Sequence, residues 1–308
     1  MHDCCILDDE RVILNMLDTE SKAGALFGYM ENQRVLLKPA FRSIVADWCI
    51  DVAMRYKLSQ ETIYLAIALL DGHLAVAAAP TKPGQLQLVA VTCLLIASKL
   101  EDTKPLTVTN VVAVCAKTYY RESIVAAEML VLKSMNWSLH IPTAWNFLAW
   151  LVSCDGRTTS DIGLFAQYIV ELVVIEYASL LLSASQIACT ALCIARQHGR
   201  VKPILCGMAA DTFMCTLIDV RPCALVIFDM LTACNSKLTA VQRKYKDGIF
   251  VLDGTWATLA HQTKRVWPPG DGDAGVLLQI LEWGLFEHAC ACFSVNDIWK
   301  ALFHARRR

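Results

Sequence analysis

One stretch constrains the fold of this chain more than any other: residues 86–100, with the sequence LQLVAVTCLLIASKL. No charged residue occurs between Leu86 and Ser98. Periodicity alone does not separate a buried strand from a buried helix, but a run of this length without Gly or Pro is typical of a helix. A helix that is apolar on every side must be surrounded by other helices. The stretch therefore predicts the central helix of an all-α domain.

Helical patterns surround this central helix in the first half of the chain. Four further helices are expected: one from Pro39, one capped by Ser59, one capped by Thr107 or Thr109, and one over about 120–135. The residues Thr81 to Gly84 are expected to break the chain before the central helix. The sequence thus predicts a five-helix domain over residues 39–141.

The same rhythm repeats after a linker at 140–143. Thr143 can cap a helix that starts at Ala144, and four more helices are expected at 161–179, 185–198, 208–216 and 222–234. We therefore predict a second five-helix domain over 142–235. A short N-terminal helix and connector (1–38) precede the pair, and a C-terminal extension (236–308) follows it, with helix candidates at 237–246, at 274–292 and after Ser294.

Composition narrows the function classes. Lys plus Arg (28) nearly balances Asp plus Glu (29), which does not suggest a nucleic-acid-binding face. The fourteen cysteines form no CxxC pair, and no signal peptide is recognisable, so we expect an intracellular, reduced protein. Glu171 and Glu176 interrupt the longest apolar run, 162–184, which argues against a membrane span.

No pattern of catalytic residues is found. The sequence lacks a Gly-rich phosphate loop, His/Cys metal-ligand spacing and a nucleophile elbow, and His73, His140 and His198 have no matched partners. We therefore predict no catalytic residue, no metal and no cofactor, and a protein that is not an enzyme.

Three segments carry a resemblance to a known family: residues 41–74, 86–102 and 126–139. They contain, in order, a basic residue before an apolar helix with Asp and Trp, a Leu-Asp helix end, a Leu-x-Ala-Ser-Lys-x-Glu helix and a Glu-x-x-x-Leu helix. This ordered combination resembles the cyclins, over about residues 39–235. The phrases DERVILNMLDTE and LKSMNWSL are most similar to D-type and gammaherpesvirus cyclins.

The resemblance implies a regulatory subunit that binds and activates a cyclin-dependent Ser/Thr kinase. Such a subunit positions the kinase αC helix and activation loop, and here it would promote G1/S progression as a viral D-type-like cyclin. The implied partner is a D-type partner kinase, with no nucleic acid and no membrane. The implied location is the nucleus and cytoplasm, or the host nucleus if the protein is viral.

The resemblance also assigns residues. Lys99 and Glu128 match kinase-contacting positions, although spacing alone favours helix-dipole pairing of Lys99 and a solvated Glu128. Arg42 and Asp71 match a pair that fastens the first helix to the second. A groove that docks substrates or inhibitors bearing Arg-x-Leu motifs would consist of Phe41, Ile44, Val45, Trp48, Asp51 and Gln87. Ile44 and Trp48 could instead be core residues.

The chain also departs from the family pattern. Gly72 follows Asp71 where Arg is usual, and Gly in a helix costs roughly 1 kcal/mol relative to Ala, so we expect the helix to bend or end there. Phe41 replaces the usual Met and would narrow the groove. The alternatives are a host cyclin of transcriptional or other type, or a cyclin-fold scaffold or nucleic-acid-binding module, which would need a basic face.

Overall fold

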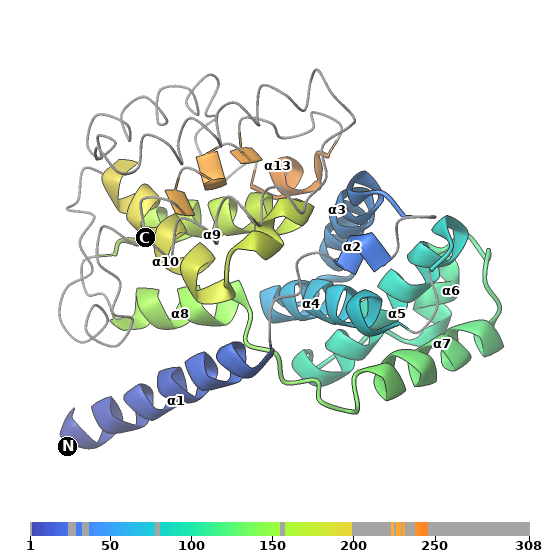
Figure 1. Cartoon of the computed structure of the whole chain (residues 1–308), viewed down its shortest axis with the longest axis horizontal. Helices are drawn as coiled ribbons and strands as arrows, with labels where there is room; N and C mark the ends of the chain where they lie inside the picture. Colours follow the sequence, from blue (N-terminus) through green and yellow to red (C-terminus); the bar gives the residue numbers. More distant parts are fainter. Residues whose placement is uncertain are drawn as a thin grey trace.

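The computed structural model describes residues 2–23, 29–32, 37–77, 81–154, 158–198 and 238–245, together with 223, 224, 226–228, 230 and 231. These residues form helices and their connections, and none of them lies in a strand, so the predicted all-α class is confirmed (Figure 1). The expected helices at 208–216, at 274–292 and after Ser294 lie outside the described residues. Within 222–234, the described residues are helical.

Five helices form the first domain. Their bounds are α3 (Pro39–Tyr56), α4 (Gln60–Val76), α5 (Pro83–Glu101), α6 (Val108–Val114) and α7 (Arg121–Ser134). Two of their starts follow directly from the sequence, because Ser59 Oγ accepts the N–H of Thr62 and Thr107 Oγ accepts that of Asn110. Between the two candidate caps of α6, the structure thus selects Thr107.

Helix α5 is the centre of this domain, as the sequence predicts. It packs against α3, α4, α6 and α7, and Val91, Leu94 and Leu95 on it are fully buried. The helix begins earlier than expected: Pro83 and Gly84, predicted as part of a break, form its first turn, where proline is favoured. Among the described residues α5 is the one helix long and apolar enough to span a bilayer, and its central position explains that composition.

The second domain contains α8 (Ala144–Cys154), α9 (Ser160–Ile175), the 3₁₀ helix η1 (Tyr177–Leu181), α10 (Ala184–His198) and α13 (Ala240–Tyr245). The apolar run predicted as a helix to 179 therefore ends earlier and changes to η1. Helices α8, α9 and α10 pack on one another around Phe147, Ile169 and Leu192, which are fully buried. Val241 and Tyr245 of α13 belong to the same core, although the sequence placed them in the extension.

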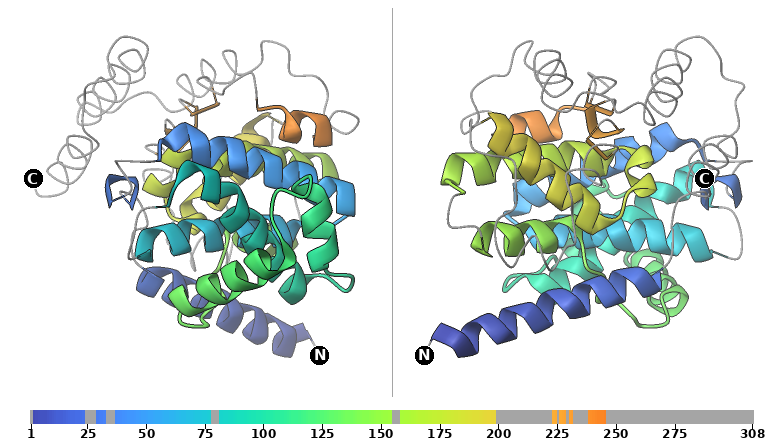
Figure 2. Two further views of the ribbon diagram at one scale, coloured as in Figure 1. Left: turned by 90° about the vertical axis from the view of Figure 1, so that its right-hand side faces the viewer. Right: turned by 60° about the vertical axis from the view of Figure 1, so that its left-hand side comes forward.

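The N-terminal helix is longer than the short helix that we expected. Helix α1 (His2–Ala23) includes the acidic opening of the chain and runs along one edge of the molecule (Figures 1 and 2). Ile13 on α1 is fully buried in the second-domain core. Near its C-terminal end, Glu20 accepts hydrogen bonds from the backbone N–H and the hydroxyl of Ser185, at 2.9 and 2.6 Å. Helix α1 thus belongs with the second domain in space.

Gly72 does not bend or end its helix, contrary to our expectation. Helix α4 continues past Gly72 to Val76. A Cβ atom at Gly72 would lie 2.8 Å from Cε of Met135, which directly follows α7. The missing side chain therefore lets the end of α7 approach α4 closely, a long-range packing requirement that the local sequence does not reveal.

Candidate functional site

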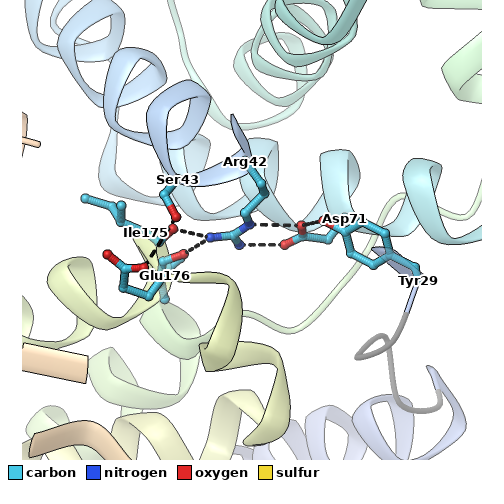
Figure 3. Close-up of polar contacts among 7 residues, drawn as sticks. Tyr29, Arg42, Ser43, Asp71, Ile175 and Glu176 are labelled. Atoms are coloured by element: carbon cyan, nitrogen blue, oxygen red, sulfur yellow. Dashed lines mark hydrogen bonds and ion pairs between the residues drawn. The ribbon is translucent and has the colours of Figure 1, made fainter. Parts of the chain in front are cut away.

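The side chain of Arg42 lies at the centre of a hydrogen-bond network (Figure 3). It is 1% exposed, and its Nε and Nη2 donate to the two carboxylate oxygens of Asp71 at 3.1 and 2.7 Å. Its Nη1 donates to the backbone carbonyls of Val174 and Ile175, at the end of α9, at 2.5 and 2.6 Å. Burial alone would lower the pKa of Arg42, but the ion pair with Asp71 raises it above its ordinary value. Arg42 therefore stays charged and joins α3 to both α4 and α9.

Tyr29 extends this network and was not identified from the sequence. It lies on α2 (Tyr29–Asn32), and its hydroxyl donates to Oδ1 of Asp71 at 2.8 Å. Its ring meets that of Tyr177 edge-on, with 5.3 Å between the centroids. Burial, reinforced by the Asp71 carboxylate, raises the pKa of Tyr29, so the hydroxyl keeps its proton and remains a donor. The network thus joins α2, α3, α4 and the end of α9 through buried hydrogen bonds.

Lys99 and Glu128 lie together at the surface of the first domain. Lys99 is in the last turn of α5, Glu128 is on α7, and their side chains form an ion pair. The Lys99 side chain is 45% exposed and that of Glu128 only 17%. Glu128 is therefore mostly shielded from solvent, and the alternative that it is a solvated charge does not apply. The sequence assigned both residues to one contact surface, and the structure shows that they also bond each other.

Exposed apolar residues occur beside this ion pair along both helices. Leu100 on α5 and Val125 and Met129 on α7 are 44–46% exposed. Val125, Glu128 and Met129 share one face of α7, because residues three and four apart are neighbours on a helix. The opposite face of α7 supplies Ile124, Ala127 and Val131 to the core. We call Lys99, Leu100, Val125, Glu128 and Met129 the α5–α7 surface.

The apolar members of the α5–α7 surface were not identified from the sequence. The signal was present, because α7 carries more apolar residues than one buried face can hold. Leu130 near the end of α7 and Trp137, three residues beyond it, are also exposed, at 58% and 61%. Exposed apolar groups that gather in one region are typical of interaction surfaces.

The four apolar residues predicted to dock partner peptides lie on α3. Ile44 is 52% exposed, which rules out the alternative that it is a core residue. Phe41, Val45 and Trp48 are half-buried and pack against the core of the first domain. We call these four residues the α3 stripe. It presents a partly exposed apolar strip with Ile44 as its most accessible member.

The two polar residues predicted beside the stripe already have partners. Both carboxylate oxygens of Asp51 accept hydrogen bonds from Nη2 of Arg243, on α13, at 2.7 and 2.6 Å. Gln87 lies on α5, and its carboxamide oxygen accepts a long hydrogen bond from the Tyr119 hydroxyl at 3.4 Å. Neither contact was predicted from the sequence.

No metal-binding cluster of three or more His, Cys, Asp or Glu side chains occurs among the residues that the structure describes. The α5–α7 surface and the α3 stripe, both formed by packed helices, are therefore the two candidate sites for protein partners.

Comparison with known families agrees with the two-domain helical fold described above. The model for "Cyclin, N-terminal domain" matches residues 11–140, and that for "Cyclin, C-terminal domain" matches residues 142–250. The chain belongs to the cyclin family. Cyclins are regulatory subunits of kinases and not enzymes themselves, in agreement with the predicted absence of catalytic residues.

Individual relatives include cyclins of the mitotic type. This cyclin is 32% identical to the G2/mitotic-specific cyclin-B of Spisula solidissima over 79% of the chain, and that alignment spans 56% of the relative. It is also 32% identical to the G2/mitotic-specific cyclin S13-7 of Glycine max, over 67% of this chain and 79% of the relative. The chain thus spans little more than half the length of the Spisula cyclin.

A solved structure of a viral cyclin from herpesvirus saimiri is similar in fold. The TM-score is 0.63 and the sequence identity 18%, with 73% of this chain and 99% of the viral chain covered. At this identity the likeness establishes the shared fold alone.

Proposed function

We propose that this cyclin binds a cyclin-dependent Ser/Thr kinase and activates it. The observation that carries this proposal is the α5–α7 surface, where an ion pair lies among exposed apolar side chains. Such a surface can bury apolar area against a partner helix, while Lys99 and Glu128 bond polar groups at its edge. Kinases with this kind of regulation require a Lys–Glu ion pair involving the αC helix, and a rigid partner surface can hold that helix in place.

The relatives and the sequence also bear on which type of kinase this cyclin binds. The B-type mitotic relatives favour a partner kinase of the mitotic type. A D-type or viral G1/S cyclin is the second candidate, favoured by the phrases DERVILNMLDTE and LKSMNWSL, but the relatives described above do not support it. In both cases we propose action in the nucleus and cytoplasm.

We further propose that the α3 stripe docks substrates or inhibitors that carry an Arg-x-Leu motif. Ile44 and its half-buried neighbours offer an apolar seat for leucine, and Asp51 lies one turn beyond Trp48 on the same helix. Gln87 would supply a polar contact from α5.

The experiment that tests kinase binding exchanges the charges of the central pair. In the double variant Lys99→Glu with Glu128→Lys, the two side chains can still bond each other, so the fold should remain stable. The charges that a partner kinase would meet are reversed. We therefore expect the amount of kinase captured from a dividing-cell lysate to fall at least about tenfold, since unpairing an interfacial charge costs about 2–5 kcal/mol. Mass spectrometry of the kinases captured by wild type identifies the subtype.

The matched control exchanges another exposed ion pair. Asp18 and Lys22 bond each other on α1, away from the α5–α7 surface, and the variant Asp18→Lys with Lys22→Asp should capture kinase normally. Normal capture by a folded Lys99/Glu128 variant would exclude this surface as the kinase contact. Failure of wild type to capture or activate any kinase would overturn the proposed function itself.

A further inference from the structure

The acid of the proposed docking groove is already occupied by this chain's own arginine. Arg243 makes two hydrogen bonds to the carboxylate of Asp51, with the Arg243 side chain 57% and the Asp51 side chain 33% exposed. The pair is therefore accessible from solvent, and an arginine from a peptide would meet Asp51 at the position that Arg243 holds.

The backbone of α13 holds Arg243 there independently of this ion pair. Ala240 and Val241 are buried, and the N–H of Ala240 donates to the carboxylate of Asp47 at 3.0 Å. Asp47 and Asp51 lie one turn apart on α3, so α13 contacts that face of α3 at two successive turns.

A second ion pair anchors α13 to α9 within the second domain. Lys244 bonds the buried carboxylate of Glu171 on α9, and it also donates to the side-chain oxygen of Gln60 at 2.7 Å. Burial raises the pKa of Glu171 although the charge of Lys244 opposes that shift. Because neighbouring side chains fix the helix, Arg243 loses little conformational freedom when it bonds Asp51.

Asp51 belongs to the same face of α3 as the exposed part of the stripe. Ile44, Trp48 and Asp51 are separated by four and three residues, a spacing that brings side chains into line along a helix. A leucine seated at Ile44 and Trp48 would thus place a nearby arginine within reach of Asp51. With Arg243 present, that arginine has to displace an existing partner.

We propose that Arg243 is a specificity-determining residue that reduces the preference of the α3 stripe for arginine-bearing peptides. The inference rests on the docking function proposed above. The apolar residues still select the leucine, while the Asp51 carboxylate, neutralised by Arg243, adds little attraction for a cationic side chain. This groove consequently accepts leucine-anchored peptides with much less regard to the arginine.

The test measures binding of two labelled synthetic peptides that differ only in carrying Arg-x-Leu or Ala-x-Leu. Fluorescence anisotropy with the full chain gives two Kd values, and their ratio is the arginine preference. We expect the variant Arg243→Ala to raise this ratio about two- to fivefold, the range that corresponds to an exposed ion pair. The Kd of the Ala-x-Leu peptide should stay unchanged. In Asp51→Asn the preference should disappear.

Arg11→Ala is the matched control, because it removes the same charge from an exposed position on α1, which lies apart from α3 (Figures 1 and 2). An equal rise of the ratio in Arg11→Ala would mean that net charge alone causes the effect, and it would overturn the inference. An unchanged ratio in Arg243→Ala would also overturn the inference, and so would an arginine preference that persists in Asp51→Asn. In either case the proposed docking groove itself would remain. If neither peptide binds wild type or variant, the docking proposal fails, and this inference with it.

Discussion

At the scale of single residues, packing against Met135 opposes the helix propensity of a larger residue at position 72. Replacing an internal helical Gly by Ala normally stabilises a protein by about 1 kcal/mol. At Gly72 the new Cβ would meet Cε of Met135 at 2.8 Å, so the end of this flexible side chain must shift, which offsets part of that gain. We therefore expect Gly72→Ala to raise the free energy of unfolding by clearly less than about 1 kcal/mol.

The full gain should appear when Met135 is shortened. In a Met135→Ala background, Gly72→Ala should raise the free energy of unfolding by about 1 kcal/mol, measured by urea denaturation of all four proteins. Gly84 is the control in the same type of element, because nothing lies within 4 Å of the Cβ that Gly84→Ala would add. An equal change in both Met135 backgrounds would mean that Met135 does not oppose the added side chain.

At the scale of elements, α1 contributes to the second-domain core through one face. Ile13 is fully buried, whereas the next residue, Leu14, is 56% exposed. Ile13→Ala should lower the free energy of unfolding by about 2–5 kcal/mol, because it removes packed methyl groups and leaves a cavity. Leu14→Ala should change it by less than about 0.5 kcal/mol. Urea midpoints of the two variants check this, and equal losses would contradict the docking of α1.

The elements also show what the sequence can predict. Pro39, Ser59 and Thr143 marked the starts of α3, α4 and α8 to within a residue, because capping and helical spacing are local properties. The pairing of Asp51 with Arg243 was not predictable, since its partners lie 192 residues apart. Lys99 and Glu128 were singled out only through the resemblance to cyclins, and spacing could not show that they bond each other.

At the scale of the whole molecule, Arg42 connects the two domains. The sequence assigned it, with Asp71, to fastening the first helix to the second. The structure adds the carbonyls of Val174 and Ile175 as acceptors, so the same guanidinium also holds the end of α9. Apolar packing joins the domains as well, because Ile50 on α3 and Tyr64 on α4 belong to the second-domain core. Buried polar and apolar contacts therefore hold the two domains together.

Two variants separate the two roles of Arg42. Asp71→Asn weakens the bond within the first domain and leaves the carbonyls of α9 bonded to Arg42. Arg42→Ala removes both sets of bonds and leaves the Asp71 carboxylate buried without its ion pair, so it should lower the free energy of unfolding by about 3–5 kcal/mol. Hydrogen–deuterium exchange should then rise in α3 and α4 for both variants, but in η1 and the last turn of α9 for Arg42→Ala alone. Ser43→Ala, which removes only a 3.4 Å contact to Glu176, is the control on the adjacent residue. Unchanged exchange at the end of α9 in Arg42→Ala would limit Arg42 to the first domain, as the sequence alone predicted.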